Sequence, residues 1–172
     1  SILCYPKPDM EEAAARVREL KRLGVEALIF EGRSQLGRLK ILGKGCVSIV
    51  VKASTSMGEY ALKIRRIDAN RPSMEKETVL HHLANKTGVG PRLYTTSANF
   101  LMMELVEGMG VVEWMKNLKG LGSVQRLRDT VKMILDQCYR LDQAGLDHGE
   151  LSNLSKHIYI DGKAVILDFE TS

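Results

Sequence analysis

The sequence predicts an α+β fold in which a sheet-rich first half is followed by a mainly helical second half. Short β-branched segments separated by glycine turns occupy residues 36–105. Two segments with the 3.6-residue period of helices follow Gly108, and Asp161-Gly162 near the end is a strong hairpin signal. Together these patterns predict antiparallel strands first and helices after them, with one hairpin closing the chain.

The first half contains two predicted helices and five predicted strands. Residues 9–23 are expected to be a helix because Asp9 and Glu12 form a capping pair and apolar residues recur at helical spacing up to Gly24. Pro72 is expected to open the second helix, which ends at the glycines before Pro91. Strands are expected over residues 39–42, 48–53, 60–64, 92–96 and 100–105.

The second half contains two further predicted helices and the terminal hairpin. Helices are expected over residues 111–118 and 123–144, and the apolar residues of the longer one share a single face. Strands are expected over residues 158–160 and 164–167, joined by Asp161-Gly162 as a type I′ turn.

Composition excludes several classes of protein. The chain has 172 residues with 25 basic and 21 acidic side chains, and its net charge of +4 permits phosphate-bearing partners without requiring them. With only one Trp, five Tyr and three Phe, we do not expect a stacking platform for single-stranded nucleic acid. The three cysteines form no C-x-x-C pair and no apolar run approaches the length of a membrane span, so we expect neither a zinc ribbon nor membrane insertion. A reducing, cytoplasmic location fits these features best.

A glycine-rich turn is the first candidate for chemistry. Gly43 and Gly45 flank Lys44, and Ser48 occupies the place of a third glycine. The β-branched residues that follow favour a strand, so the pattern does not open a helix as a dinucleotide fingerprint would. A glycine turn between two strands lets backbone amides approach a phosphate, although an ordinary glycine-rich hairpin would have the same sequence.

A lysine and an acid form the second candidate. Lys63 ends the motif Tyr60-Ala-Leu-Lys63 in the strand after the glycine turn, where it is either a phosphate contact or an exposed strand lysine. Glu75 and Glu77 lie on the next predicted helix and point to different faces of it. Because Glu77 shares the side of Leu80 and Leu83, we expect it to be the partner of Lys63.

Two carboxylates close the series of motifs. Glu150 lies in His148-Gly-Glu-Leu-Ser152 and Asp168 in Ile166-Leu-Asp-Phe-Glu170, at the ends of neighbouring predicted loops. One carboxylate near an acceptor hydroxyl and another holding Mg²⁺ are what phosphoryl transfer requires. Between the sheet and the helices, Leu101-Met-Met-Glu-Leu-Val-Glu-Gly108 has the pattern of a hinge, or of a buried strand that ends in a turn.

In this order the motifs resemble those of the eukaryotic-like protein kinase superfamily. His148-Gly-Glu-Leu-Ser152 is similar to the H-G-D-L-S of RIO-type kinases, and the region from Glu77 to Pro91 resembles small atypical archaeal serine/threonine kinases. The resemblance implies a bilobal fold with an N-terminal lead-in (residues 1–35), an N-lobe with a five-stranded antiparallel sheet and a helix (36–107), and a truncated, mainly helical C-lobe (108–172). It also implies ATP with Mg²⁺ and phosphoryl transfer to a hydroxyl, that of a protein serine or threonine being the expected acceptor.

The resemblance carries roles to particular residues. It implies that Lys63, Glu150 and Asp168 are catalytic and that Asp168 holds the metal, with Asn153, Ser155 or His157 as a second ligand. The nucleotide-binding residues that it implies are Gly43, Lys44, Gly45, Ser48, Val50, Ala61, Lys63, Glu77, Met103, Glu104 and Val106.

Departures from the family pattern keep a second interpretation open. Glu150 replaces the usual Asp, Glu170 replaces the glycine of D-F-G, and the usual second metal ligand is unassigned. These changes favour a pseudokinase, which would act as a nucleotide-binding or scaffolding module. Since no activation segment or later helix follows Glu170, we expect either a shortened chain or a partner, or a second copy, covering the apolar face of residues 123–144. The +4 charge leaves a nucleic-acid-associated protein as a third hypothesis.

Overall fold

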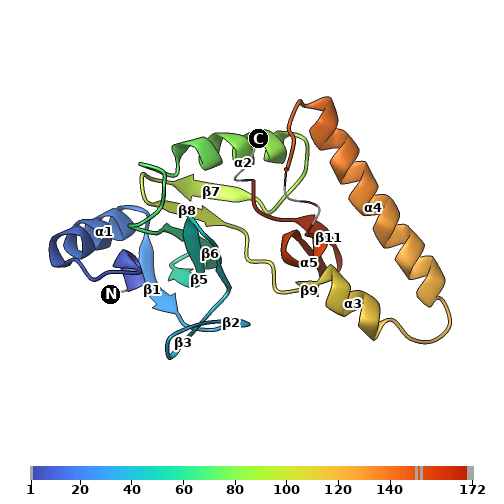
Figure 1. The fold of residues 1–172 in the computed structure, drawn as a ribbon, viewed down its shortest axis with the longest axis horizontal. Coiled ribbons are helices and arrows are strands. Elements are labelled where there is room, and N and C mark those ends of the chain that lie inside the picture. Colours follow the sequence, from blue (N-terminus) through green and yellow to red (C-terminus); the bar gives the residue numbers. More distant parts are fainter. Residues whose placement is uncertain (1, 150, 152, 170–172) are drawn as a thin grey trace. The chain divides into compact units, whose positions relative to one another are not determined.

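The computed structural model describes residues 2–149, 151 and 153–169 and is a mixed α+β structure with antiparallel sheets (Figure 1). It divides into two compact units. The first comprises Ser1–Thr78 and Leu93–Leu105, and the second comprises Val79–Arg92 and Val106–Ser172. Residues 1–35, expected as a separate lead-in, thus belong to the first unit.

A six-stranded antiparallel sheet forms the centre of the first unit (Figure 1). Its main path runs β1 (Val25–Ile29), β5 (Ser48–Thr55), β6 (Gly58–Arg65), β8 (Phe100–Met103) and β7 (Leu93–Thr96). A short strand, β4 (Gly43–Lys44), also pairs with β5. The strands β2 (Ser34–Leu36) and β3 (Leu39–Ile41) form a separate two-stranded sheet.

The expected five-stranded sheet was therefore wrong in two respects. The strand expected at residues 39–42 pairs with β2 instead of joining the main sheet. The sequence analysis also missed β1, whose register against β5 shifts between Val25 and Ala27. A bulge interrupts the two-residue alternation of a strand, so this segment carries no clear period in its sequence.

One face of the main sheet is covered by the N-terminal elements η1 (Ile2–Cys4) and α1 (Met10–Arg22). The predicted capping contact is present, with the Glu12 amide donating to Asp9 Oδ1 at 2.9 Å, and the helix spans nearly the predicted residues. Leu3, Cys4 and Leu20 from these elements pack into the buried core of this face. The strand residues of that core are Ile49, Val51, Ala53, Leu62, Ile64, Phe100 and Met102.

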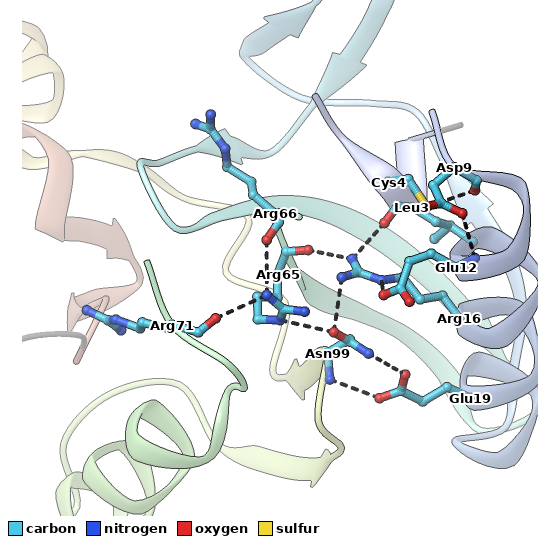
Figure 2. A network of polar contacts seen from close by, with 10 residues as sticks. All are labelled: Leu3, Cys4, Asp9, Glu12, Arg16, Glu19, Arg65, Arg66, Arg71 and Asn99. Carbon is cyan, nitrogen blue, oxygen red and sulfur yellow. Dashed lines mark hydrogen bonds and ion pairs between the residues drawn. The ribbon is translucent and has the colours of Figure 1, made fainter. Parts of the chain in front are cut away.

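Arg16 of α1 is fully buried and ties the N-terminal segment to the sheet (Figure 2). Its guanidinium donates to the carbonyl oxygens of Leu3 at 2.7 Å and Arg65 at 2.5 Å, and to Asn99 Oδ1 at 3.0 Å. Glu12 provides the balancing charge at 2.7 Å. Because buried carbonyls need donors, this one side chain links three otherwise separate segments.

Glu19 closes the same network from the next turn of α1 (Figure 2). Its carboxylate accepts from the backbone amide of Asn99 at 2.9 Å and from the Asn99 side chain at 2.8 Å. Burial raises the pKa of Glu19, but the hydrogen bonds from Asn99 and the charge of Arg16 outweigh it and lower the pKa below its ordinary value.

The second unit packs helices against a three-stranded sheet ordered β11 (Lys163–Ile166), β10 (Ile158–Asp161) and β9 (Met109–Gly110). Its helices are α3 (Val111–Asn117), α4 (Ser123–Gln143), the short α5 (Leu154–His157) and most of α2 (Glu75–Lys86), whose first residues belong to the first unit. The two predicted helices and the predicted hairpin are confirmed. The predicted type I′ turn was wrong, because it requires positive φ at both central residues and Asp161, which pairs with Lys163, does not have it. The core consists of Ala84, Val89, Val111, Leu141, Leu146, Ile158, Ile166 and Phe169.

The long helix α4 contacts the sheet through only part of its surface. Gln137 Nε2 donates to the Ala164 carbonyl oxygen at 2.8 Å, and Leu141 enters the core. Val124, Val131 and Leu135 of the predicted apolar face stay exposed. Among the described residues, no helix has the length and apolarity needed to span a membrane.

Candidate functional site

Several predicted nucleotide-binding residues lie together on the second face of the first unit's sheet because of the strand register. Val50 lies opposite both Gly43 on β4 and Lys63 on β6. Two positions further along, Ala61 lies opposite Met103 on β8. Directly opposed residues of antiparallel strands share a face, and alternate residues of a strand return to it. Val50, Ala61, Lys63 and Met103 therefore lie on one face, away from η1 and α1.

The same face carries a small apolar cluster. Ala61, Leu101, Met103 and Met74 are its buried members. Val50, Leu42, Leu93 and Leu105 pack against them and stay partly exposed. An apolar surface with a few polar groups placed at its edge is the usual lining of a site for a flat organic ligand.

Lys63 and Glu77 form a buried ion pair at this cluster. Lys63 Nζ donates to Glu77 Oε1, and their side chains are only 6% and 1% exposed. Glu77 lies in the first turn of α2, whose approach is fixed by the Met74 amide donating to the Ala98 carbonyl oxygen at 2.9 Å. The acid predicted as the partner of Lys63 is thus the one in contact with it, whereas Glu75 is exposed.

Burial of the Lys63–Glu77 pair is not explained by its contribution to folding stability. Removing two charges from water opposes folding, and their attraction repays this only when other hydrogen bonds complete the pair. Glu77 Oε2 is buried with no hydrogen-bond partner among the described residues. A buried, incompletely satisfied ion pair of this kind is more typical of a functional site than of a core.

Glycine at positions 43 and 45 is not required by the fold. A Cβ at Gly43 would lie 3.8 Å from Val50, and one at Gly45 would lie 3.5 Å from the Ser48 carbonyl oxygen, both ordinary contact distances. Neither residue has a positive φ. By contrast, a Cβ at Gly108 would collide with the Ile160 carbonyl. Bare backbone at 43 and 45 therefore suits the approach of a group from outside the chain.

Arg66 and Tyr5 contact the glycine turn and restrain it. The Gly45 amide donates to the Ser48 carbonyl oxygen at 2.8 Å, and Arg66 Nη1 donates to the Gly45 carbonyl oxygen at 2.9 Å. The Arg66 guanidinium and Lys44 Nζ lie 5.0 and 5.1 Å from the centre of the Tyr5 ring. These contacts restrain the tip of the turn.

Two residues of the predicted phosphate-binding turn, Lys44 and Ser48, do not present their side chains to a phosphate. Lys44 directs its ammonium over the Tyr5 ring, a cation–π contact. Ser48 is 2% exposed and contributes its carbonyl oxygen to the turn, so its hydroxyl is not presented to solvent. Of the predicted phosphate-binding turn, the backbone around Gly43 and Gly45 thus remains as the candidate phosphate contact.

The predicted hinge follows β8 directly. Met103 ends the strand, Glu104 is exposed and Val106 is half-buried. Further on, the Glu107 amide donates to Asp161 Oδ2 at 3.1 Å within the second unit. Glu104 belongs to the first unit and Val106 to the second.

Asp168 lies in the second unit at the end of β11. Its backbone has φ +73°, a left-handed conformation that is rare for residues other than glycine, and its side chain is 30% exposed. Non-glycine residues held in this conformation cluster at functional sites. The neighbouring Phe169 is buried and packs on the rings of His81 and His148.

One of the three candidates for a second metal ligand, His157, lies beside Asp168. His157 Nδ1 lies 3.8 Å from Asp168 Oδ2. Asn153 and Ser155 are exposed, and the Ser155 hydroxyl donates to Asn153 Oδ1 at 2.8 Å. Glu150, the predicted catalytic acid, and Glu170 lie outside the described residues.

The donor chemistry at Asp168 fits Mg²⁺. Carboxylate oxygen is a preferred ligand of that ion, which usually takes one or two carboxylates and fills its other positions with phosphate oxygens and water. Within the described ranges, no group of three or more His, Cys, Asp or Glu side chains could hold a metal by itself.

Sequence reasoning missed Tyr5, Arg66 and Arg16. Arg66 follows Lys63 by three residues, yet nothing in a strand sequence indicates that its side chain turns back to Gly45. Tyr5 and Arg16 lie in the segment interpreted as a lead-in. The one available signal was the polar Arg16 amid the apolar residues of an amphipathic helix.

The comparisons with known proteins provide no independent assignment: no family model and no curated protein matches this chain.

Proposed function

We propose that this protein binds ATP with a divalent cation and transfers the terminal phosphoryl group to a hydroxyl, in a bilobal, kinase-like arrangement. The observation that carries the proposal is the buried Lys63–Glu77 pair, on the same sheet face as Val50, Ala61 and Met103 and next to a glycine turn whose glycines the fold does not need. The expected acceptor is a protein serine or threonine, as the sequence resemblance implies.

In this proposal each residue has a defined task. Backbone amides of the turn other than that of Gly45, which is bonded to Ser48, bind phosphate oxygens, and Ala61, Val50 and Met103 contact the base. Lys63, held by Glu77, orients the phosphates, while Asp168 with a second donor holds the cation. That cation, when bound, neutralises charge on the phosphates. Glu150 orients the acceptor hydroxyl and takes its proton.

A nucleotide-binding protein without transfer activity is the second candidate. It is favoured by Glu150, whose carboxylate is one methylene further from the backbone than that of Asp. A displacement of about 1 Å in a reacting group can lower a rate by roughly a hundredfold. Slow transfer or none would follow, with nucleotide binding intact.

One experiment separates these functions. The melting temperature and the transfer of labelled phosphate are followed together while ATP is added, with and without Mg²⁺, to wild type, Lys63→Met and Asp168→Asn. At an ATP concentration of about 100 times Kd, binding to the folded state should add about 2.7 kcal/mol of stability. Metal-dependent stabilisation with transfer supports the kinase, and stabilisation without transfer supports the pseudokinase.

The common action of Lys63 and Asp168 on one nucleotide is tested by a double-mutant cycle. If both contact the same phosphates, their effects on ATP affinity are non-additive by about 0.5–3 kcal/mol. Additive effects, or unchanged nucleotide binding in both single variants, would refute the proposal.

A further inference from the structure

His157 and Asp168 are brought together by the terminal hairpin. Ile158 at the start of β10 pairs with Ile166 at the end of β11, so the residues just outside this pair lie at the same end of the ladder. The Leu167 amide donates to the His157 carbonyl oxygen at 2.8 Å and extends the pairing by one step. The position of the imidazole relative to the carboxylate is thus set by the backbone.

The two side chains present a nitrogen and an oxygen donor to a common point. His157 Nδ1 lies 3.8 Å from Asp168 Oδ2. The imidazole nitrogen is buried, and the Asp168 side chain is 30% exposed, so an ion would reach the pair from the carboxylate side. Donors in adjacent positions of an octahedral ion, each about 2.1 Å from it, lie about 3.0 Å apart. The two atoms would therefore have to approach each other by about 0.8 Å to bind one ion.

The other available donors do not compete for this place. The Ser155 hydroxyl donates to Asn153, and Cys138 packs against the core of the unit. The ring of His148 packs edge-on against that of His157, with 5.4 Å between their centres. His148 Nε2 lies 2.8 Å from the Leu167 carbonyl oxygen. His157 Nδ1 is thus a nitrogen donor that the structure places beside Asp168.

From this geometry we propose that His157 Nδ1 is the second protein ligand of the ion that Asp168 holds, and that the site prefers Mn²⁺ to Mg²⁺. This inference rests on the proposed function, because the remaining positions of the ion are left to phosphate oxygens and water. Mg²⁺ strongly favours oxygen ligands and near-ideal octahedral geometry. Transition-metal ions accept imidazole more readily, and Mn²⁺ among them also suits carboxylate, phosphate and water.

A direct test uses wild-type protein with Mn²⁺ and a non-hydrolysable ATP analogue. Electron spin-echo measurements on the bound Mn²⁺ should show modulation from a directly coordinated nitrogen. Isotopic labelling of the protein nitrogen should change that modulation, which distinguishes imidazole from the nitrogen atoms of the base. Modulation without a protein contribution would overturn the proposal, and this readout does not depend on any variant folding.

Variants supply the second test. With the same analogue, wild type should bind Mn²⁺ at least about tenfold more tightly than Mg²⁺, and His157→Asn should lose most of that preference, since loss of a group at a metal site commonly changes affinity by about 10–100-fold. His157→Gln repeats the test with a longer amide. His82→Asn, which removes an exposed histidine of α2, should leave both affinities unchanged.

The outcomes separate this inference from the proposed function. If Asp168→Asn abolishes metal-dependent nucleotide binding while both His157 variants keep the Mn²⁺ preference, the role of His157 is refuted and the nucleotide site stands. If neither ion promotes nucleotide binding to wild type, both proposals fail.

Discussion

The buried Lys63–Glu77 pair yields a prediction that separates function from folding stability. Lys63→Met leaves the Glu77 carboxylate, whose side chain is 1% exposed, without its cation. Removing one partner of a buried ion pair destabilises a protein by about 3–5 kcal/mol. At about 2–4 °C per kcal/mol for a chain of this size, the melting temperature should fall by about 6–20 °C.

Replacing both members should have a different result. In Lys63→Met/Glu77→Leu no charge remains, and the new Met side chain lies opposite Leu101 on β8. Exchange of a buried ion pair for apolar residues of similar volume is neutral or stabilising by about 1–4 kcal/mol. The double variant should therefore be at least as stable as wild type, yet ATP with Mg²⁺ should no longer raise its stability.

Urea titration followed by circular dichroism, with and without nucleotide, measures both effects. Glu75→Leu and Lys76→Met are matched controls at exposed positions of the same helix and should change stability by less than about 0.5 kcal/mol. A double variant as unstable as Lys63→Met would show that the pair serves folding. Retained stabilisation by ATP would show that it does not serve the nucleotide.

Three further predictions concern other parts of the molecule. Arg16→Met should lower the free energy of unfolding by about 3 kcal/mol or more in urea, because each buried acceptor left unsatisfied costs about 1–3 kcal/mol, whereas exposed Arg18→Met should have little effect. Burial raises the pKa of Glu19, but hydrogen bonds outweigh this effect, so the pKa of Glu19 is lower in the folded than in the unfolded protein. Glu19 therefore stabilises the fold above its unfolded pKa, and this stabilisation is lost as the pH falls through the folded pKa. Acid titration of stability should thus be shallower in Glu19→Gln, and an unchanged profile would contradict this. Exposed Cys46, in the glycine turn, should be alkylated before Cys138, whose thiol pKa is raised by burial and by Asp142, and ATP with Mg²⁺ should protect Cys46; mass spectrometry of the labelled peptides checks both the order and the protection.

Local sequence patterns were sufficient for most elements. The capping pair at Asp9 and Glu12, the long amphipathic helix and the pairing of the two strands around Asp161-Gly162 each depend on residues close together in the chain, and each is present. The partner of Lys63 was also predictable, because the helical period assigns Glu75 and Glu77 to different faces. These inferences succeed because a helix or a tight turn is determined by contacts over a few residues.

Long-range packing decided the remainder. β1 is a strand because it pairs with β5 across a bulge. β3 is not part of the main sheet because it pairs with β2. Lys44, predicted to bind phosphate, places its ammonium over the Tyr5 ring instead. Arg66, which was not predicted to contribute, donates a hydrogen bond to the Gly45 carbonyl oxygen in the glycine turn. Residue types alone thus specified which chemistry the chain can offer, namely glycines, a lysine with its acid, and a carboxylate. Which side chains meet depended on tertiary structure, since strand register and the burial of polar groups join segments that lie up to 83 positions apart, as Arg16 and Asn99 do.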